Sequence, residues 1–127
     1  MSERKNVETV KQAYAAFGRG DIPALLEMMS EEVDWVVTDI LPQGGSFRGR
    51  DGVGQFFEGV GREWPELEIE LDELVADGDH VIGLGHGKGK LAGGEAADYG
   101  FAHAFTVADG KIVRFREYAD PGAGLTN

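Results

Sequence analysis

The residues best suited to chemistry lie near the end of the chain, where His103 interrupts an apolar strand pattern. Phe101, His103, Phe105 and Val107 fall on one face of that strand, because successive side chains of a strand alternate sides. Such a histidine either packs as a structural side chain or faces a cavity. A neutral imidazole in a cavity could donate a hydrogen bond from one nitrogen and accept one at the other. We therefore treat His103 as a candidate catalytic residue.

A candidate carboxylate follows on the next expected strand, beyond the turn at residues 108–110. Phe115, Glu117 and Ala119 share one parity there, and Phe115 indicates that this set faces inward. Glu117 would then approach the cavity and could form an acid–base pair with His103. Pairing of Glu117 with arginines on neighbouring strands is the alternative.

The first third of the chain predicts two helices. Val7, Val10, Tyr14 and Phe17 recur at steps of three and four, as on an amphipathic helix that begins near Ser2 and ends by residues 18–20. A second helix is expected from an N-cap at Asp21 to Ser30, with Pro23 in its first turn.

A strand, a loop and a third helix are expected next. Trp35 belongs to an alternating segment, which predicts a strand from about Glu32 to Ile40. The proline and glycines of residues 41–45 indicate a loop. Phe56 lies on the apolar side of a helix that follows residue 49.

The remaining chain predicts a meander of four long strands. From Glu66 the apolar period is two, and it slips after Glu73, where a bulge would restore it. Asp77-Gly78-Asp79 is typical of a hairpin turn. In the strand from His80 to Leu91 every second residue from 83 to 89 is glycine, so a bulky group should approach its bare backbone closely. Helices followed by a mainly antiparallel sheet indicate an α+β fold in a single domain spanning residues 1–127.

The order of these motifs resembles the SnoaL-like branch of the nuclear-transport-factor-like superfamily, which includes ketosteroid isomerases. The resemblance rests on a helix-Gly-Asp-helix segment, a strand bearing Trp35, the run Phe47-Arg48-Gly49-Arg50-Asp51, and the ending His103 to Asp120. It implies a curved sheet wrapped by three N-terminal helices into a cone (a cystatin-like α+β cone), with an apolar pocket at the open end. Dimers that form through the outer sheet face are common in the family.

The resemblance also implies roles for individual residues. His103 occupies the strand position where ketosteroid isomerase has a neutral, hydrogen-bond-donating aspartic acid. Asp39 lies near the position of the proton-abstracting carboxylate, and Tyr14 resembles the tyrosine that donates to the substrate oxygen. Asp120 matches the family ending and could lie at the pocket mouth. Large aromatic side chains would line the pocket, and these are Trp35, Phe56, Trp64 and Phe101.

Composition excludes several classes of function. The chain has 127 residues, a net charge of −11 and no cysteine. The acidic balance argues against nucleic acid, whose binding depends on Lys and Arg. The absence of cysteine, of an export signal and of a long apolar run fits a cytoplasmic protein that does not enter a membrane. His80 and His86 have no metal-ligand spacing, so we expect no metal and no cofactor.

Two hypotheses follow from these observations. The first is an enzyme that performs cofactor-free acid–base chemistry, namely isomerisation, cyclisation, dehydration or epoxide hydrolysis, on an apolar small molecule. Asp39 or Glu117 would remove a proton, and His103 with Tyr14 would stabilise the oxyanion. The second is a non-catalytic module of the same fold that binds a ligand or a protein. A homodimer is expected to use the later strands, because the acidic face of Glu68 to Asp72 would repel its own copy.

Overall fold

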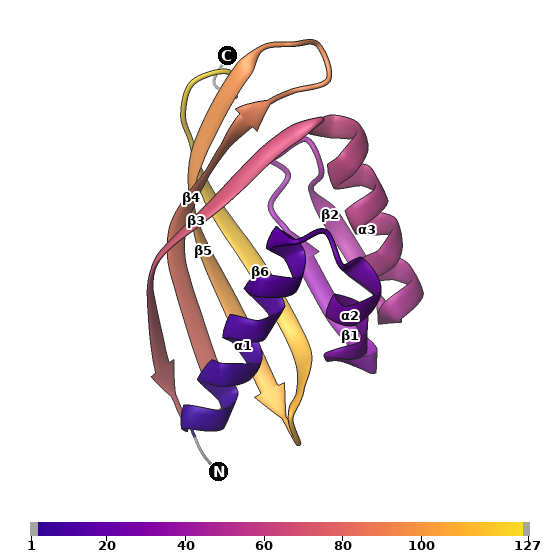
Figure 1. Ribbon diagram of the computed structural model, residues 1–127, viewed down its shortest axis with the longest axis vertical. Coiled ribbons are helices and arrows are strands. Elements are labelled where there is room, and N and C mark those ends of the chain that lie inside the picture. The colour runs from indigo at the N-terminus through magenta and orange to yellow at the C-terminus, as the bar shows by residue number, and fades with distance from the viewer. Residues whose placement is uncertain (1–2, 126–127) are drawn as a thin grey trace.

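The computed structural model describes residues 3–125 and contains one curved, unclosed sheet of six strands (Figure 1). The strands are β1 (Met29–Val37), β2 (Gly45–Arg48), β3 (Glu66–Asp77), β4 (His80–Lys90), β5 (Ala96–Ala108) and β6 (Lys111–Pro121). Their order across the sheet is β2-β1-β6-β5-β4-β3. Neighbours pair antiparallel except β1 and β6, which are parallel. The predicted α+β fold with a mainly antiparallel sheet is therefore confirmed.

Three helices lie against the inner side of the sheet: α1 (Glu3–Gly18), α2 (Ile22–Glu27) and α3 (Gly49–Glu63). In Figure 1, α1 runs along the long strands and α3 lies beside β1 and β2. The start of α1 is tied to the β3–β4 turn, where the Glu3 carboxylate accepts from the Gly78 amide at 2.8 Å. Ser2, the expected start of this helix, lies outside the described residues. No helix within residues 3–125 has the length and apolar character needed to cross a membrane.

The second helix is shorter than predicted, and the first strand begins and ends earlier. Asp21 caps α2 as expected, since its Oδ1 accepts from the Ala24 amide at 3.2 Å. The helix nevertheless ends at Glu27 and not at Ser30, because the chain there already pairs with β6: the Ile112 amide donates to the Met28 carbonyl at 2.9 Å. The strand ends at Val37 because residues 38–40 turn back toward the loop.

Strand β2 was not predicted. Its four residues, Gly45–Arg48, lie at the sheet edge and pair antiparallel with β1, with Phe47 opposite Trp35. A segment this short, entered through two glycines, has too little alternation to distinguish it from a loop. Arg50 follows in α3 and donates from Nε and Nη2 to the Met29 carbonyl at 3.0 and 2.8 Å, which fixes the helix to the start of β1.

The meander from β3 to β6 agrees with the prediction. The register of β3 against β4 shifts between Leu71 and Glu73, so an irregularity lies beside the position where the apolar alternation slips. The turn at residues 77–79 joins the two strands, and Gly78 has a φ of 62°, which favours glycine. This shift keeps the apolar side chains of both halves of β3 on the inner face, against α1.

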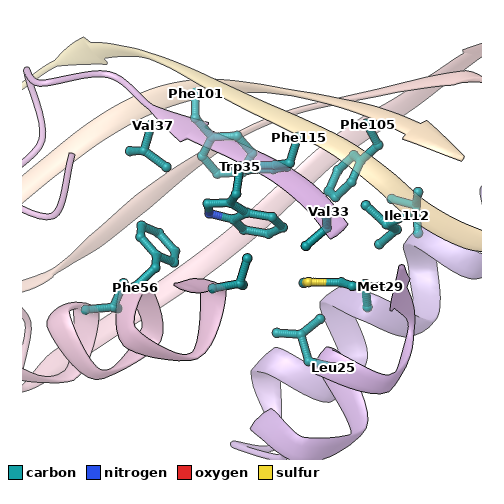
Figure 2. Packing of buried hydrophobic residues seen from close by; sticks show 14 of the residues in the cluster. Leu25, Met29, Val33, Trp35, Val37, Phe56, Phe101, Phe105, Ile112 and Phe115 are labelled. Carbon is teal, nitrogen blue, oxygen red and sulfur yellow. The ribbon is translucent and has the colours of Figure 1, made fainter. Parts of the chain in front are cut away.

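The core lies between the sheet and the helices (Figure 2). Trp35 of β1 stacks on Phe115 of β6 with ring centroids 3.9 Å apart, and Phe56 of α3 contacts its other side at 5.7 Å. These rings are 3–5% exposed. Burying aromatic groups of this size supplies a large share of the hydrophobic free energy of a domain this small.

Candidate functional site

A buried chain of hydrogen bonds joins three elements at the centre of the sheet's inner face. His103 on β5 lies directly opposite Glu117 on β6, and its Nε2 is 2.8 Å from Glu117 Oε2. On its other side, His103 Nδ1 is 2.7 Å from the hydroxyl oxygen of Tyr14 on α1. His103 and Glu117 are only 7% and 6% exposed. The three side chains form one polar cluster, here called the acid–base triad.

The chemistry of the three groups determines the direction of these bonds. An ionised Glu117 can only accept, so the proton between it and His103 lies on Nε2. Nδ1 of the neutral imidazole is then an acceptor, and the Tyr14 hydroxyl donates to it. In this arrangement both hydrogens of the triad are used internally. Oε1 of Glu117 has no hydrogen-bond partner within residues 3–125.

The environment keeps Tyr14 protonated. Burial raises the pKa of the Tyr14 phenol, and the negative charge of Glu117 raises it further. Both effects disfavour a phenolate. Tyr14 is therefore a hydrogen-bond donor in the resting site and not a base, which leaves His103 and Glu117 as the groups able to accept a proton.

Aromatic rings hold the imidazole in one plane. Phe101 stacks on His103 with centroids 3.8 Å apart and an angle of 8° between the planes. Phe105 and Phe115 contact the imidazole from other directions, at 6.2 and 5.1 Å. Phe101 thus supports the imidazole from behind and is absent from the cavity wall. A ring packed in this way can offer its two nitrogens only along the line from Tyr14 to Glu117.

The glycines of β4 leave space for two tyrosine side chains. A Cβ at Gly83, which pairs with His103, would lie 2.5 Å from the Tyr14 hydroxyl oxygen. A Cβ at Gly87, which pairs with Tyr99, would lie 2.7 Å from that ring. Such separations are below van der Waals contact, so any larger residue at either position would displace a tyrosine. The bulky groups expected against the bare backbone of this strand include these two phenols.

A small cavity adjoins the triad. Its volume is about 80 Å³, enough for a few water molecules or a small ligand. The wall is mainly apolar, and Trp35 and Phe56 belong to it. Its polar members come from α1, β5, β6 and the loop between β1 and β2, and they are Tyr14, Gln43, Tyr99, His103 and Glu117. An apolar space with a few converging polar groups is the usual form of a small-molecule site.

Gln43 is a buried polar residue that the sequence reasoning missed. It lies in the loop between β1 and β2, is 7% exposed and accepts a hydrogen bond from the Trp64 indole at 2.9 Å. The interaction explains the position of Trp64, which closes the end of α3 beside this loop. A signal was present in the sequence, since Gln43 is a lone polar side chain in a Pro-Gly loop that follows a buried strand.

Four of the predicted site residues do not line the cavity. Phe101 stacks on His103, and Trp64 donates to Gln43, without belonging to the cavity wall. Asp39 is exposed in the turn after β1, because the strand ends two residues before it and the chain turns outward. Asp120 is exposed on β6 and has the parity of Tyr118, opposite to that of Glu117, so it lies on the outer side of the sheet. Within residues 3–125, no group of three or more histidine, aspartate or glutamate side chains could hold a metal ion.

Comparison with known proteins gives matches along nearly the whole chain. An uncharacterised protein of Mycobacterium tuberculosis is 29% identical over 126 residues, which cover 97% of this chain and 95% of that protein. An NTF2-like protein of Burkholderia thailandensis has a similar structure, with a TM-score of 0.86 and 30% identity over 94% of this chain and 92% of that one. TerC, crystallised with polyporic acid, gives a TM-score of 0.81 and 27% identity over 91% of this chain and 92% of that one.

The family model for the SnoaL-like domain matches residues 10–115. This range contains α2, α3, β1 to β5 and most of α1, including Tyr14, Gln43 and His103. The SnoaL-like resemblance noted in the sequence is therefore confirmed, and the chain belongs to the SnoaL-like domain family.

Proposed function

We propose that this protein is an enzyme that performs cofactor-free acid–base chemistry on an apolar small molecule. The observation that carries the proposal is the acid–base triad, buried among aromatic rings beside an apolar cavity. Buried ionisable pairs seldom increase stability over apolar residues of equal size. A buried carboxylate–imidazole pair next to a ligand-sized space is therefore better explained by chemistry than by folding.

Glu117 is the proposed base. Its Oε1 accepts the proton that leaves a substrate carbon, and the electron pair of the broken C–H bond moves toward an adjacent carbonyl, giving an enolate oxygen. Return of the same proton to a different carbon completes an isomerisation. Asp39 has no part in this mechanism because it lies outside the cavity.

Tyr14 and His103 stabilise the developing charge. The Tyr14 hydroxyl turns from His103 Nδ1 toward the enolate oxygen, and a donor in a water-poor site is most effective when charge develops on its acceptor. His103 holds both partners in place through its two nitrogens. The raised pKa of Tyr14 suits this role, because the phenol remains a donor throughout the reaction.

The substrate class follows from the wall of the cavity. Apolar side chains surround the triad, so the substrate is a largely hydrophobic ketone, or an epoxide opened by the same acid–base groups. Small-molecule binding at a related fold supports this class, since TerC was crystallised with polyporic acid.

Hydrogen–deuterium exchange tests the proposal without knowledge of the natural substrate. A panel of cyclic ketones in D₂O is followed by NMR for protein-dependent loss of the protons next to the carbonyl. The wild-type protein should accelerate exchange, and Glu117→Gln should reduce the acceleration by at least about 100-fold, the size of a general-base contribution. Glu58→Gln, on the exposed side of α3, is the matched control. Equal exchange rates with Glu117→Gln and wild type would refute the proposal.

A non-catalytic binding module is the second candidate. The triad favours it in one respect, because Tyr14, His103 and Glu117 satisfy one another without a ligand. Binding of members of the panel with no protein-dependent exchange would support this function in place of the first.

We also propose that a second copy of the chain covers the outer face of the sheet. Tyr118 of β6 and Leu84 of β4 are 60% and 36% exposed there, with Ala102 of β5 between them in register. The apolar strip lies between the acidic β3 and the arginines of β6, so a two-fold copy could place opposite charges together. Sedimentation velocity should show a dimer that Tyr118→Glu dissociates. A wild-type protein that remains monomeric at high concentration would refute this proposal.

A further inference from the structure

The cavity has a second polar end that the proposed acid–base mechanism does not use. Gln43 and Tyr99 form it, and Trp64 supports Gln43 from outside the cavity wall. Gln43 and Tyr99 both line the cavity, and all three side chains are at most 7% exposed. Tyr99 lies four residues before His103 on β5, so the backbone positions of the two ends are about 13 Å apart. The arrangement of hydrogen-bond donors at this end indicates what it could bind.

Trp64 fixes the orientation of the Gln43 amide. The indole Nε1 can only donate, so the Gln43 atom 2.9 Å away must be the carbonyl oxygen. This bond turns the amide nitrogen away from Trp64. The Gln43 amide therefore presents its NH₂ donor in a single orientation, without the flip that a less constrained amide could make.

Tyr99 lines this end of the cavity together with Gln43. Burial raises the pKa of the Tyr99 phenol, and the negative charge of Glu117 raises it further. Within residues 3–125 the Gln43 side chain forms one hydrogen bond, the one from Trp64, so both hydrogens of its amide NH₂ can donate to a ligand. Tyr99 itself keeps a protonated hydroxyl. This end of the cavity is thus rich in donors.

The acid–base end has the opposite character. Both hydrogens of the triad are used internally, in the bonds from Tyr14 to His103 and from His103 to Glu117. A ligand oxygen that arrives there must first displace the Tyr14 hydroxyl from Nδ1. A ligand oxygen at Gln43 meets a donor with no such competition. The field of Glu117 extends to Tyr99, so an uncharged oxygen is preferred to a carboxylate.

We propose that Gln43, oriented by Trp64, recognises an uncharged oxygen acceptor of the ligand at the end of the cavity away from Glu117. This inference rests on the function proposed above and defines its substrate class more closely. The substrate is an apolar molecule with one carbonyl beside Glu117, the proposed base, and a second carbonyl or ether oxygen that accepts a hydrogen bond from Gln43. The second oxygen fixes which carbon faces Glu117. Gln43 acts in binding and specificity and does not touch the reacting atoms.

Two ligands of equal shape test this assignment. Cyclohexanone and methylenecyclohexane differ only in an oxygen that replaces a CH₂ group, so a hydrogen bond to the ligand affects one of them alone. Binding is measured by NMR titration of ¹⁵N-labelled protein, with the indole N–H of Trp64 as a reporter beside Gln43. Gln43→Leu should weaken cyclohexanone about tenfold and methylenecyclohexane less than about threefold, as for the loss of one hydrogen bond.

Two further variants complete the experiment. Gln55→Leu makes the same change on the exposed side of α3 and should leave both affinities unchanged. Gln43→Glu keeps an oxygen for Trp64 but removes the NH₂ donor, so it should weaken cyclohexanone even if Gln43→Leu fails to fold. Equal weakening of both ligands, or a wild-type protein that binds neither, would overturn the role of Gln43.

Because binding is read without turnover, the two proposals can fail separately. Intact discrimination by Gln43 in a protein that exchanges no ketone protons would refute the proposed enzyme and leave a ligand-binding site. Ketone exchange with no change in Gln43→Glu would refute the recognition role alone.

Discussion

Replacement of His103 by leucine tests whether the acid–base triad is kept at a cost in stability. The substitution removes the partner of a Glu117 carboxylate that is only 6% exposed, and it also removes the acceptor of the Tyr14 hydroxyl. Removing the hydrogen-bond partner of a buried carboxylate leaves that charge without compensation, which costs about 3–5 kcal/mol when one member of a buried pair is removed. For a chain of this length such a loss lowers the melting temperature by about 10–20 °C.

The double variant His103→Leu/Glu117→Leu should recover most of that loss. With both polar groups gone, no charge is buried without a partner, and two leucines add apolar contacts with Phe101 and Phe105. Replacing a buried pair by apolar residues of similar volume is often neutral or stabilising. We expect the double variant to lie within about 1 kcal/mol of the wild type. That result would show that the triad is not required for folding.

The assay is urea unfolding followed by tryptophan fluorescence, with midpoint and slope compared among the variants. His86→Leu is a matched control, because His86 also contacts a carboxylate, Glu70 at 2.5 Å, but on the exposed outer face. An exposed pair contributes little, so this control should change stability by less than about 1 kcal/mol. A double variant no more stable than His103→Leu alone, or a His103→Leu protein as stable as wild type, would refute the reasoning.

Three further predictions concern the packing and the charge of the site. Gly83→Ala places a Cβ 2.5 Å from the Tyr14 hydroxyl and should lower the free energy of unfolding by about 1–3 kcal/mol in thermal unfolding. In the control Gly61→Ala the added Cβ meets nothing within 4 Å, so this variant should be as stable as wild type or more stable. An equal loss of stability in the two variants would contradict this account. The pKa values of Tyr14 and Tyr99 are raised in the folded protein, so the two phenols contribute stability below pH 10.0 that is lost as the pH rises beyond that value. The absorbance of phenolate should therefore include these two tyrosines only as the protein unfolds. Ionisation of either one in the native protein would exclude the proposed mechanism. A hydrogen bond from Arg116 lowers the pKa of Asp34 in the folded protein, so the Asp34 carboxylate contributes stability above pH 3.8 that is lost as the pH falls below that value. Asp34→Asn should reduce the loss of stability in acid by less than about 1 kcal/mol. A steeper loss of stability in acid would refute the assignment.

The sheet and the neighbours of His103 could be predicted because they depend on local alternation. Phe101, His103 and Phe105 share one parity, and Phe115 indicates that Glu117 faces the same inner side of the sheet. The pairing of Glu117 with His103 also needs a register shift between Thr106 and Val107, because the register at the turn, continued without this shift, would place Arg116 opposite His103. The pairing with Tyr14 needed more, since the position of α1 over the sheet is set by packing and by the space above Gly83.

The loop after β1 could not be predicted in the same way. Asp39 was aligned to a catalytic position by counting residues from a distant motif, and a strand that ends two residues earlier directs it to solvent. Gln43 lacked any periodic pattern that would indicate burial. Its position depends on Trp64, twenty-one residues later, and a contact of that kind is fixed by how α3 packs against the loop.

The two polar ends of the cavity are supported by different parts of the fold. His103 and Glu117 belong to paired central strands, where a shift of one residue would turn every side chain to the other face. Gln43 belongs to a loop and is held by one hydrogen bond to Trp64. Substitutions in that loop can therefore alter which oxygen the cavity recognises while the strands keep the base in place. For this reason a substitution at Gln43 should change ligand preference while the His103–Glu117 pair keeps its geometry, and ligand titration can measure that effect separately from the unfolding of His103→Leu.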